Sequence, residues 1–158
     1  MAILYLMHGF VGAGKTTFAK KLELEKRAVR YSHDEWMRDR FGENPPAGKF
    51  AEYYEIVADD IKQQAAERLS RGQDVILDFG FWTRADRDEY RSWADLMGAE
   101  CVLYYIHADP DVMKARVLKR TEELPEGQLV IDENAIELFK TKFEPLAADE
   151  AHISVGTD

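Results

Sequence analysis

Gly9-Phe10-Val11-Gly12-Ala13-Gly14-Lys15-Thr16 directly follows the apolar run 3–7 and precedes a segment of helical periodicity. Glycines at positions 12 and 14 leave space for backbone N–H groups to close around phosphate oxygens, and a helix that begins near Lys15 directs its positive end toward them. The Lys15 side chain is expected to reach the β- and γ-phosphates, and the Thr16 hydroxyl to bind Mg²⁺. Placed between a strand and a helix, this pattern predicts a loop that binds nucleotide phosphates rather than a glycine-rich turn without a ligand.

We expect the nucleotide to be ATP, bound together with Mg²⁺. The predicted ATP-binding residues are Gly9, Gly12, Ala13, Gly14, Lys15, Thr16 and Thr17. For Thr17 two interpretations stay open, a phosphate contact or only a residue of the first helical turn.

Short strand-like runs alternate with segments of helical periodicity along the whole chain. The runs cover residues 3–7, 28–32, 75–78, 101–107 and 153–155. Apolar residues at spacings of three or four predict an amphipathic helix over 50–69, and further helices are expected over 110–124 and 131–143. The alternation predicts an α/β fold in which helices cover both faces of a five-stranded parallel sheet.

Length and composition are those of one globular domain. The 158 residues, 46% hydrophobic and 32% charged, predict a single domain spanning 1–158. No apolar run approaches the roughly 18 residues needed to cross a bilayer, and the N-terminus lacks a signal-peptide pattern. We therefore expect a cytoplasmic protein without membrane association, and the sequence does not indicate its oligomeric state.

Most of the formal charge of −9 lies in residues 121–158, where ten Asp and Glu residues stand against two lysines. Extended nucleic acid is bound by clustered Lys and Arg, so this distribution argues against such a partner without excluding a short nucleotide. The simplest interpretation of the acidic residues is that they solvate helix faces.

Polar residues that follow strands are candidates for chemistry, because ligands bind beyond the carboxyl ends of parallel strands. After the second strand, Ser32 and Glu35 have capping-box spacing, which leaves Asp34 free in the first helical turn. Asp34 suits a base that receives a hydroxyl proton during phosphoryl transfer, and the alternative is a favourable charge at a helix N-terminus. His33 competes for the same role and is otherwise expected to line the substrate site.

Asp78 ends the apolar third strand and is expected to act with Thr16 at Mg²⁺. Shortly after it, Arg84 is a candidate ligand for substrate. For Arg84, Arg87 and Arg91 together, binding of an anionic substrate and simple solvation of a helix are equally open interpretations.

Arg116 and Arg120 lie four residues apart on the predicted helix 110–124 and project from one face. Two guanidinium groups on one face can hold transferring phosphates, since the transition state spreads negative charge over the equatorial oxygens. The alternative is that both arginines face solvent and pair with the glutamates that follow them.

The pattern over nearly the whole chain resembles the small P-loop kinases grouped with AAA-type ATP-binding kinase-like proteins, zeta toxins, chloramphenicol phosphotransferase and polynucleotide kinase. The matching residues are Gly9 to Thr16, Ser32-His33-Asp34-Glu35-Trp36, Val75-Ile76-Leu77-Asp78 with Thr83-Arg84, and the pair Arg116 and Arg120. The resemblance implies a three-layer P-loop fold with strand order 2-3-1-4-5, Asp34 as the base, and Arg116 and Arg120 in a lid at about 112–130. Arg38 stands near, but one residue away from, the position of an arginine that holds the substrate's phosphate in polynucleotide kinase.

Two functions of different classes remain. The first is transfer of the γ-phosphate of ATP to a hydroxyl of a small molecule or nucleotide-like acceptor, with Lys15, Asp34, Arg116 and Arg120 as catalytic residues and His33, Arg38 and Arg84 as substrate ligands. The second is an ATP-dependent binding or regulatory module without a small-molecule acceptor. A search for phosphorylated product separates them.

Overall fold

A computed structural model describes residues 1–42, 46–123 and 133–157. The strands are β1 Ile3–His8, β2 Val29–Ser32, β3 Val75–Gly80, β4 Glu100–His107 and β5 Ile153–Gly156. The helices are α1 Lys15–Lys26, α2 His33–Phe41, α3 Phe50–Ser70, α4 Arg84–Leu96, α5 Pro110–Glu122 and α6 Glu133–Lys142, with a 3₁₀ turn, η1, at Ala47–Lys49.

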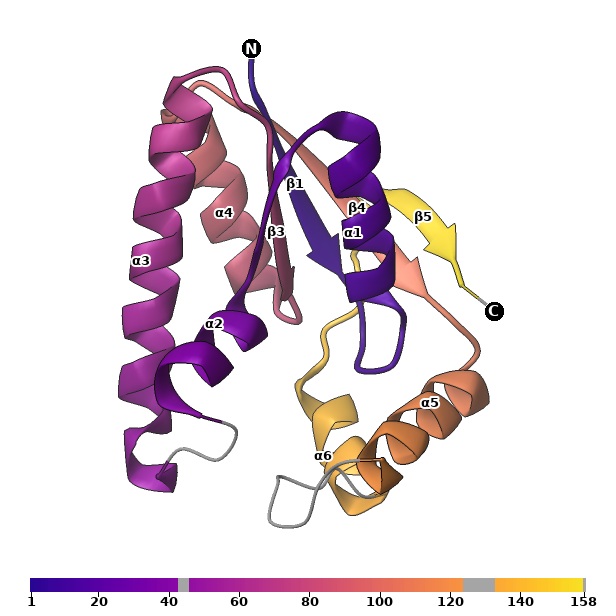
Figure 1. The fold of residues 1–158 in the computed structure, drawn as a ribbon. Helices are drawn as coiled ribbons and strands as arrows, with labels where there is room; N and C mark the ends of the chain where they lie inside the picture. Colours follow the sequence, from indigo (N-terminus) through magenta and orange to yellow (C-terminus); the bar gives the residue numbers. More distant parts are fainter. Residues whose placement is uncertain (43–45, 124–132, 158) are drawn as a thin grey trace.

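All strand pairs are parallel, and the sheet order is β2-β3-β1-β4-β5. This confirms the expected strand order. Each predicted strand lies within two residues of an observed one, and the helix predicted over 50–69 is α3. The strands run so that their carboxyl ends, and the loops that follow them, meet at one edge of the sheet (Figure 1).

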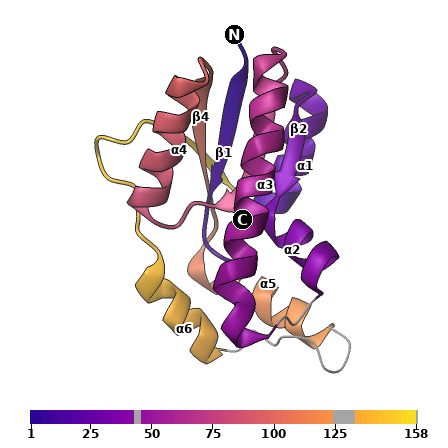
Figure 2. The ribbon, with the colours of Figure 1, turned by 90° about the vertical axis from the view of Figure 1, so that its left-hand side faces the viewer.

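Side chains alternate across the central strand β1 and divide the core into two layers. Leu4 and Leu6 join a cluster with α3 and α4, whereas Tyr5 and Met7 join a cluster with α1. The helices accordingly lie on opposite sides of the sheet in Figures 1 and 2. The expected three-layer arrangement is confirmed.

A third apolar cluster lies beyond the carboxyl end of the sheet and joins α5 and α6 to the first loop. Phe10, Val117 and Ile136 are its buried members, and Trp82 packs against them. This cluster brings the helix that carries Arg116 and Arg120 next to the loop after β1. Of the lid predicted at about 112–130, residues 124–130 lie outside the described part of the chain.

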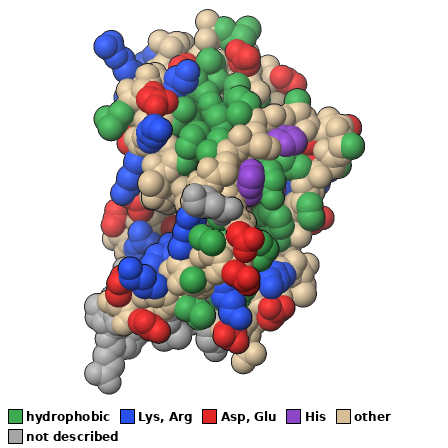
Figure 3. All heavy atoms as spheres, turned by 90° about the vertical axis from the view of Figure 1, so that its right-hand side faces the viewer, with side chains coloured by type: hydrophobic (Ala, Val, Ile, Leu, Met, Phe, Trp, Pro, Cys, Tyr) green, Lys and Arg blue, Asp and Glu red, His purple; other side chains and the backbone are tan. Residues whose placement is uncertain are grey.

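The C-terminal segment packs on the sheet through β5, which pairs with β4 from Tyr104–Ile153 to His107–Gly156. This strand forms an edge of the sheet, and Ile153 is 48% exposed. Figure 3 shows apolar side chains gathered over the upper middle of this face, with charged side chains at its margins and over the lower part. No helix among the described residues is long and apolar enough to cross a membrane.

Candidate active site

The loop between β1 and α1 has the geometry that its glycines allow. Gly12 (φ +83°) and Gly14 (φ +95°) lie in the left-handed region, and Gly14 caps α1. A Cβ at Gly12 would lie 2.5 Å from the Met113 carbonyl oxygen of α5. Gly9 does not have a positive φ; a Cβ there would lie 2.6 Å from the Ile106 oxygen, so close packing is the reason for this glycine.

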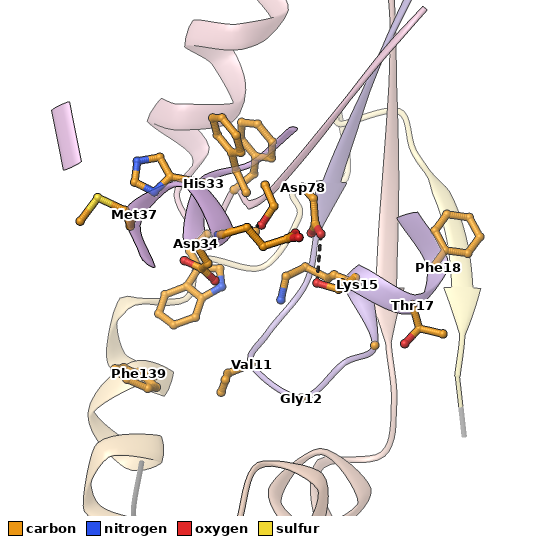
Figure 4. A pocket seen from close by; sticks show the side chains of 18 of the residues that line it. Val11, Gly12, Lys15, Thr17, Phe18, His33, Asp34, Met37, Asp78 and Phe139 are labelled. Carbon is orange, nitrogen blue, oxygen red and sulfur yellow. Dashed lines mark hydrogen bonds between the residues drawn. The ribbon is translucent and has the colours of Figure 1, made fainter. Parts of the chain in front are cut away.

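Lys15 projects from the first turn of α1 and turns back over the loop. Its Nζ donates to the Phe10 carbonyl oxygen at 3.0 Å. Desolvation lowers the pKa of Lys15, the nearby carboxylates of Asp78 and Asp34 oppose this shift, and Arg120 adds to it. Figure 4 shows Lys15, Asp34 and Asp78 arranged around one hollow.

Asp78 and Thr16, the two residues expected to act at Mg²⁺, are in contact. The Thr16 hydroxyl donates to Asp78 Oδ2 at 3.0 Å, and Asp78 is buried at the end of β3. A hydroxyl and a carboxylate are the oxygen ligands that Mg²⁺ takes when substrate phosphates and water complete its shell. The pair therefore has the donor chemistry of a magnesium site.

Arg30 on β2 also reaches this carboxylate and was not anticipated. Its Nη1 lies 3.4 Å from Asp78 Oδ2, and its guanidinium forms two hydrogen bonds with Glu35, at 2.6 and 3.0 Å. Burial raises the pKa of Asp78, while Thr16, Lys15 and Arg30 act in the opposite direction. Only the parallel register of β2 and β3, which pairs Ser32 with Asp78, could have suggested this contact.

Helix α2 begins at the carboxyl end of β2 and carries the candidate base. Ser32 caps it by accepting from the Glu35 N–H at 3.3 Å, as expected for that spacing. Asp34 is exposed in the first turn and lines the cleft, as does Arg38 on the same helix. His33 is only 3% exposed, and its Nε2 lies 3.0 Å from the Tyr54 carbonyl oxygen.

The arginines of α5 differ from each other. Arg116 donates to the Gly12 carbonyl oxygen at 3.2 Å and to the Thr157 hydroxyl at 2.9 Å, so it joins the first loop to the end of β5. Arg120 is exposed, lines the cleft and forms no ion pair with any described residue. Both arginines line the cleft from α5, as expected for one helix face, but Arg116 is engaged by the Gly12 carbonyl oxygen and Thr157.

Arg84 lies outside the cleft, which corrects its expected place among the substrate ligands. It forms two hydrogen bonds with Asp149, at 2.7 and 2.8 Å, on the surface. Arg87 is fully buried and pairs with Glu150, and Arg91 also reaches Glu150. These arginines hold the C-terminal segment, so the acidic residues there do more than solvate helix faces.

Trp82, after β3, was not anticipated as a support of the first loop. Its indole Nε1 donates to the Gly9 carbonyl oxygen at 3.0 Å, and its ring stacks on Phe10 with centroids 5.6 Å apart. The chain turns into this position through two residues of positive φ, Gly80 and Phe81. The aromatic run was visible in the sequence, but its direction depends on this turn.

One cleft of about 1930 Å³ connects these groups. Typical small-molecule sites measure about 300–1,000 Å³, so this cleft can accommodate a nucleotide and a second molecule together. The first loop, α1 and α5 line one half, and α2, α3 and α4 line the other. Asp34 and Lys15 both line the cleft, from opposite halves.

The comparisons with known proteins agree with this architecture. The AAA domain model AAA_33 matches residues 4–146. Shikimate kinases of Bacillus anthracis and Bacillus cereus are 28% identical to the chain over 151 residues, which cover 94% of this chain and 85% of theirs.

Solved structures show the same fold at low identity. A candidate kinase from Chloroflexus aurantiacus has a TM-score of 0.77 and 21% identity, covering 98% of this chain and 88% of its own. A gluconokinase from Sinorhizobium meliloti has a TM-score of 0.62 and 14% identity, covering 96% and 81%. With a family model matched over most of its length and a strand order shared with P-loop kinases, the chain belongs to the AAA_33 family of small P-loop kinase-like proteins.

Proposed function

We propose that this protein transfers the γ-phosphate of ATP to a hydroxyl group of a small molecule. The observation that carries the proposal is that Lys15, at the start of α1, and Asp34 on α2 line one cleft from opposite halves. The kinase names of the relatives, shikimate kinase and gluconokinase, support a small-molecule acceptor in general terms. They do not select which one.

The loop half of the cleft is suited to the donor. Backbone N–H groups of residues 12–16 and the N-terminus of α1 supply positive potential for phosphate oxygens. Lys15 adds a cation, and Thr17 is exposed at the same edge of the cleft. When bound between Thr16 and Asp78, Mg²⁺ would neutralise charge on the β- and γ-phosphates.

The transfer step follows from the position of Asp34. An acceptor hydroxyl placed beside Asp34 attacks the γ-phosphorus, the new O–P bond forms, and the bond to the β-phosphate oxygen breaks to release ADP. Asp34 takes the proton of the hydroxyl, and Lys15 and Arg120 stabilise the charge that develops on the transferred group. His33 and Arg38, which line the same half as Asp34, are proposed to contact the acceptor.

We propose different roles in phosphate transfer for Arg116 and Arg120. Because Arg116 is bonded to Gly12 and Thr157, it fixes α5 against the first loop and presents its charge beside the phosphates. Arg120 is exposed and remains able to approach the transferred group.

The alternative function is a nucleotide-dependent switch without an acceptor, in which ATP draws α5 onto the first loop. The bonds of Arg116 to Gly12 and Thr157 are compatible with such a switch. It predicts ATP binding without any phosphorylated product, whereas the proposed transferase predicts both.

The test is incubation of the protein with ATP, Mg²⁺ and a broad set of hydroxylated metabolites, followed by mass measurement of the products. We expect one class of compound to gain the mass of a phosphoryl group, in step with ADP release, and Lys15→Ala to abolish the gain. Lys26→Ala is the matched control, because this lysine ends α1 away from the cleft. ATP binding with no phosphorylated product over the whole set would favour the switch.

A further inference from the structure

The two halves of the cleft carry opposite charge. Lysines and arginines of α1 and α5, among them Lys15 and Arg120, dominate the donor half. On the other side, α3 and α4 present four carboxylates, Glu55, Asp59, Asp86 and Glu89. A phosphate donor explains the positive half, but it does not explain the negative one.

These four carboxylates are only partly offset by the cations of their own half of the cleft, Lys62 on α3 and Arg38 on α2. Within the described residues, none of them forms an ion pair. They also belong to no group of three or more acidic, His or Cys side chains in the described chain that could hold a metal ion. Their spread over two helices suits an extended organic cation better than a metal.

A second feature of this wall is a buried imidazole, that of His33, which is among the side chains that line the cleft. His33 is only 3% exposed. Its Nε2 donates a hydrogen bond to the Tyr54 carbonyl oxygen, because a carbonyl oxygen can only accept. Burial lowers the pKa of His33, which favours the neutral ring, and since Nε2 donates, the lone pair of that ring is on Nδ1. No described residue is bonded to that Nδ1, so a ligand N–H is a fitting partner.

Aromatic rings complete the wall and already hold one cation. The Tyr54 ring packs on His33 with centroids 3.9 Å apart. The ammonium of Lys62 lies 4.8 Å from the centroid of the Tyr90 ring, and Tyr90, a buried residue, lines the cleft. Carboxylates, a lone pair and π faces all attract positive charge.

We propose that the acceptor is a hydroxylated amine, whose ammonium group lies between the carboxylates of α3 and α4 while its hydroxyl lies at Asp34. This inference rests on the proposed function and names its substrate class. The balance of the reaction is unchanged: the hydroxyl oxygen gains the phosphoryl group, Asp34 takes the proton, ADP leaves, and the ammonium is a spectator. An anionic or nucleotide-like acceptor would instead face repulsion from the same side chains.

The test uses the whole protein with ADP and Mg²⁺ and three matched groups of probes. They are amines (glucosamine, galactosamine, kanamycin), neutral compounds (glucose, galactose, inositol) and acids (gluconate, glucuronate, shikimate). Calorimetry measures binding, and product mass with ATP measures transfer. We expect amines to bind at least about tenfold more tightly than the neutral compounds, and acids to bind most weakly.

The double variant Asp86→Asn with Glu89→Gln is expected to remove most of the preference for amines and to leave ATP affinity unchanged. Asp95→Asn, on the same helix but outside the cleft, is the control and should keep the preference. Neutral compounds or acids that bind as tightly as amines, or equal effects of the double variant and the control, would overturn the inference. Phosphorylation of neutral or acidic probes in preference to the amines would overturn the inference while sustaining the kinase function. Selective amine binding without any transfer would support an amine-binding wall but would speak against the kinase function, and with it against the amine as acceptor.

Discussion

Replacing Arg87 by methionine removes a cation that is fully buried between α4 and the C-terminal segment. Its guanidinium donates to Glu150 at 2.8 and 3.1 Å. It also donates to backbone carbonyl oxygens, of Phe81 at 2.9 Å and of Glu144 at 3.1 Å. Methionine fills a similar volume but makes none of these bonds.

The magnitude follows from what the substitution leaves behind. Loss of one partner of a buried ion pair costs about 3–5 kcal/mol, because the other charge stays buried. Here Arg91 and the Ala147 N–H still contact the Glu150 carboxylate, each at 2.8 Å, which favours the lower end, about 3 kcal/mol. A domain of ordinary stability, about 5–15 kcal/mol, would survive this loss.

Urea unfolding measures the effect. With a slope of about 2 kcal/mol per molar, the midpoint of Arg87→Met should fall by about 1.5 M at an unchanged slope. Arg84→Met is the control, since it breaks an exposed pair with Asp149 and should leave the midpoint unmoved within error. Equal midpoints for the two variants would refute the assignment of Arg87 as the bond between α4 and the C-terminal segment.

Two further predictions concern the first loop and the end of β1. Gly12→Ala would place a methyl group at a residue of positive φ and against the Met113 carbonyl oxygen, whereas Gly72 has a similar φ (+79°) and no atom within 4 Å of the added Cβ. We expect Gly12→Ala to be less stable than Gly72→Ala by at least about 1 kcal/mol. We also expect only Gly12→Ala to lose the thermal stabilisation by ATP. Equal melting temperatures and equal responses to ATP would contradict this. Burial lowers the pKa of His8 from 6.5 to about 4, so below pH 6.5 the unfolded chain binds a proton there that the folded chain does not. The free energy of unfolding should therefore fall by about 3 kcal/mol between pH 6.5 and 4, and His8→Asn should show a clearly smaller fall; parallel curves for the two proteins would speak against it.

The sequence predicted the fold because its signals are local and agree with one another. The first loop, the apolar strand runs and the 50–69 periodicity each depend on neighbouring residues, and parallel topology limits how such pieces assemble. The cap of α2 was predicted for the same reason, since Ser32 accepts from the N–H of Glu35, three residues on.

Parts of the site that depend on distant contacts were not predicted. Arg30 on β2 contacts Asp78 on the neighbouring strand β3, and Trp82 donates to Gly9, which lies 73 residues away in the sequence. Arg84 looked like a substrate ligand because it follows β3, but its pairing with Asp149 depends on where the C-terminal segment crosses α4. Long side chains at helix starts can turn either way, and only tertiary contacts decide.

The most direct test of the proposed transferase is Asp34→Asn, compared with the wild type for an acceptor that is phosphorylated. Asparagine keeps the shape of the side chain but takes up no proton, so transfer should slow by about 10²–10⁴-fold. The affinity for ATP with Mg²⁺ should stay within about twofold, because Lys15, Thr16 and Asp78 are untouched. Unchanged transfer, or a loss of ATP affinity that accounts for the whole effect, would contradict a base at Asp34 and with it the direction of transfer across the cleft.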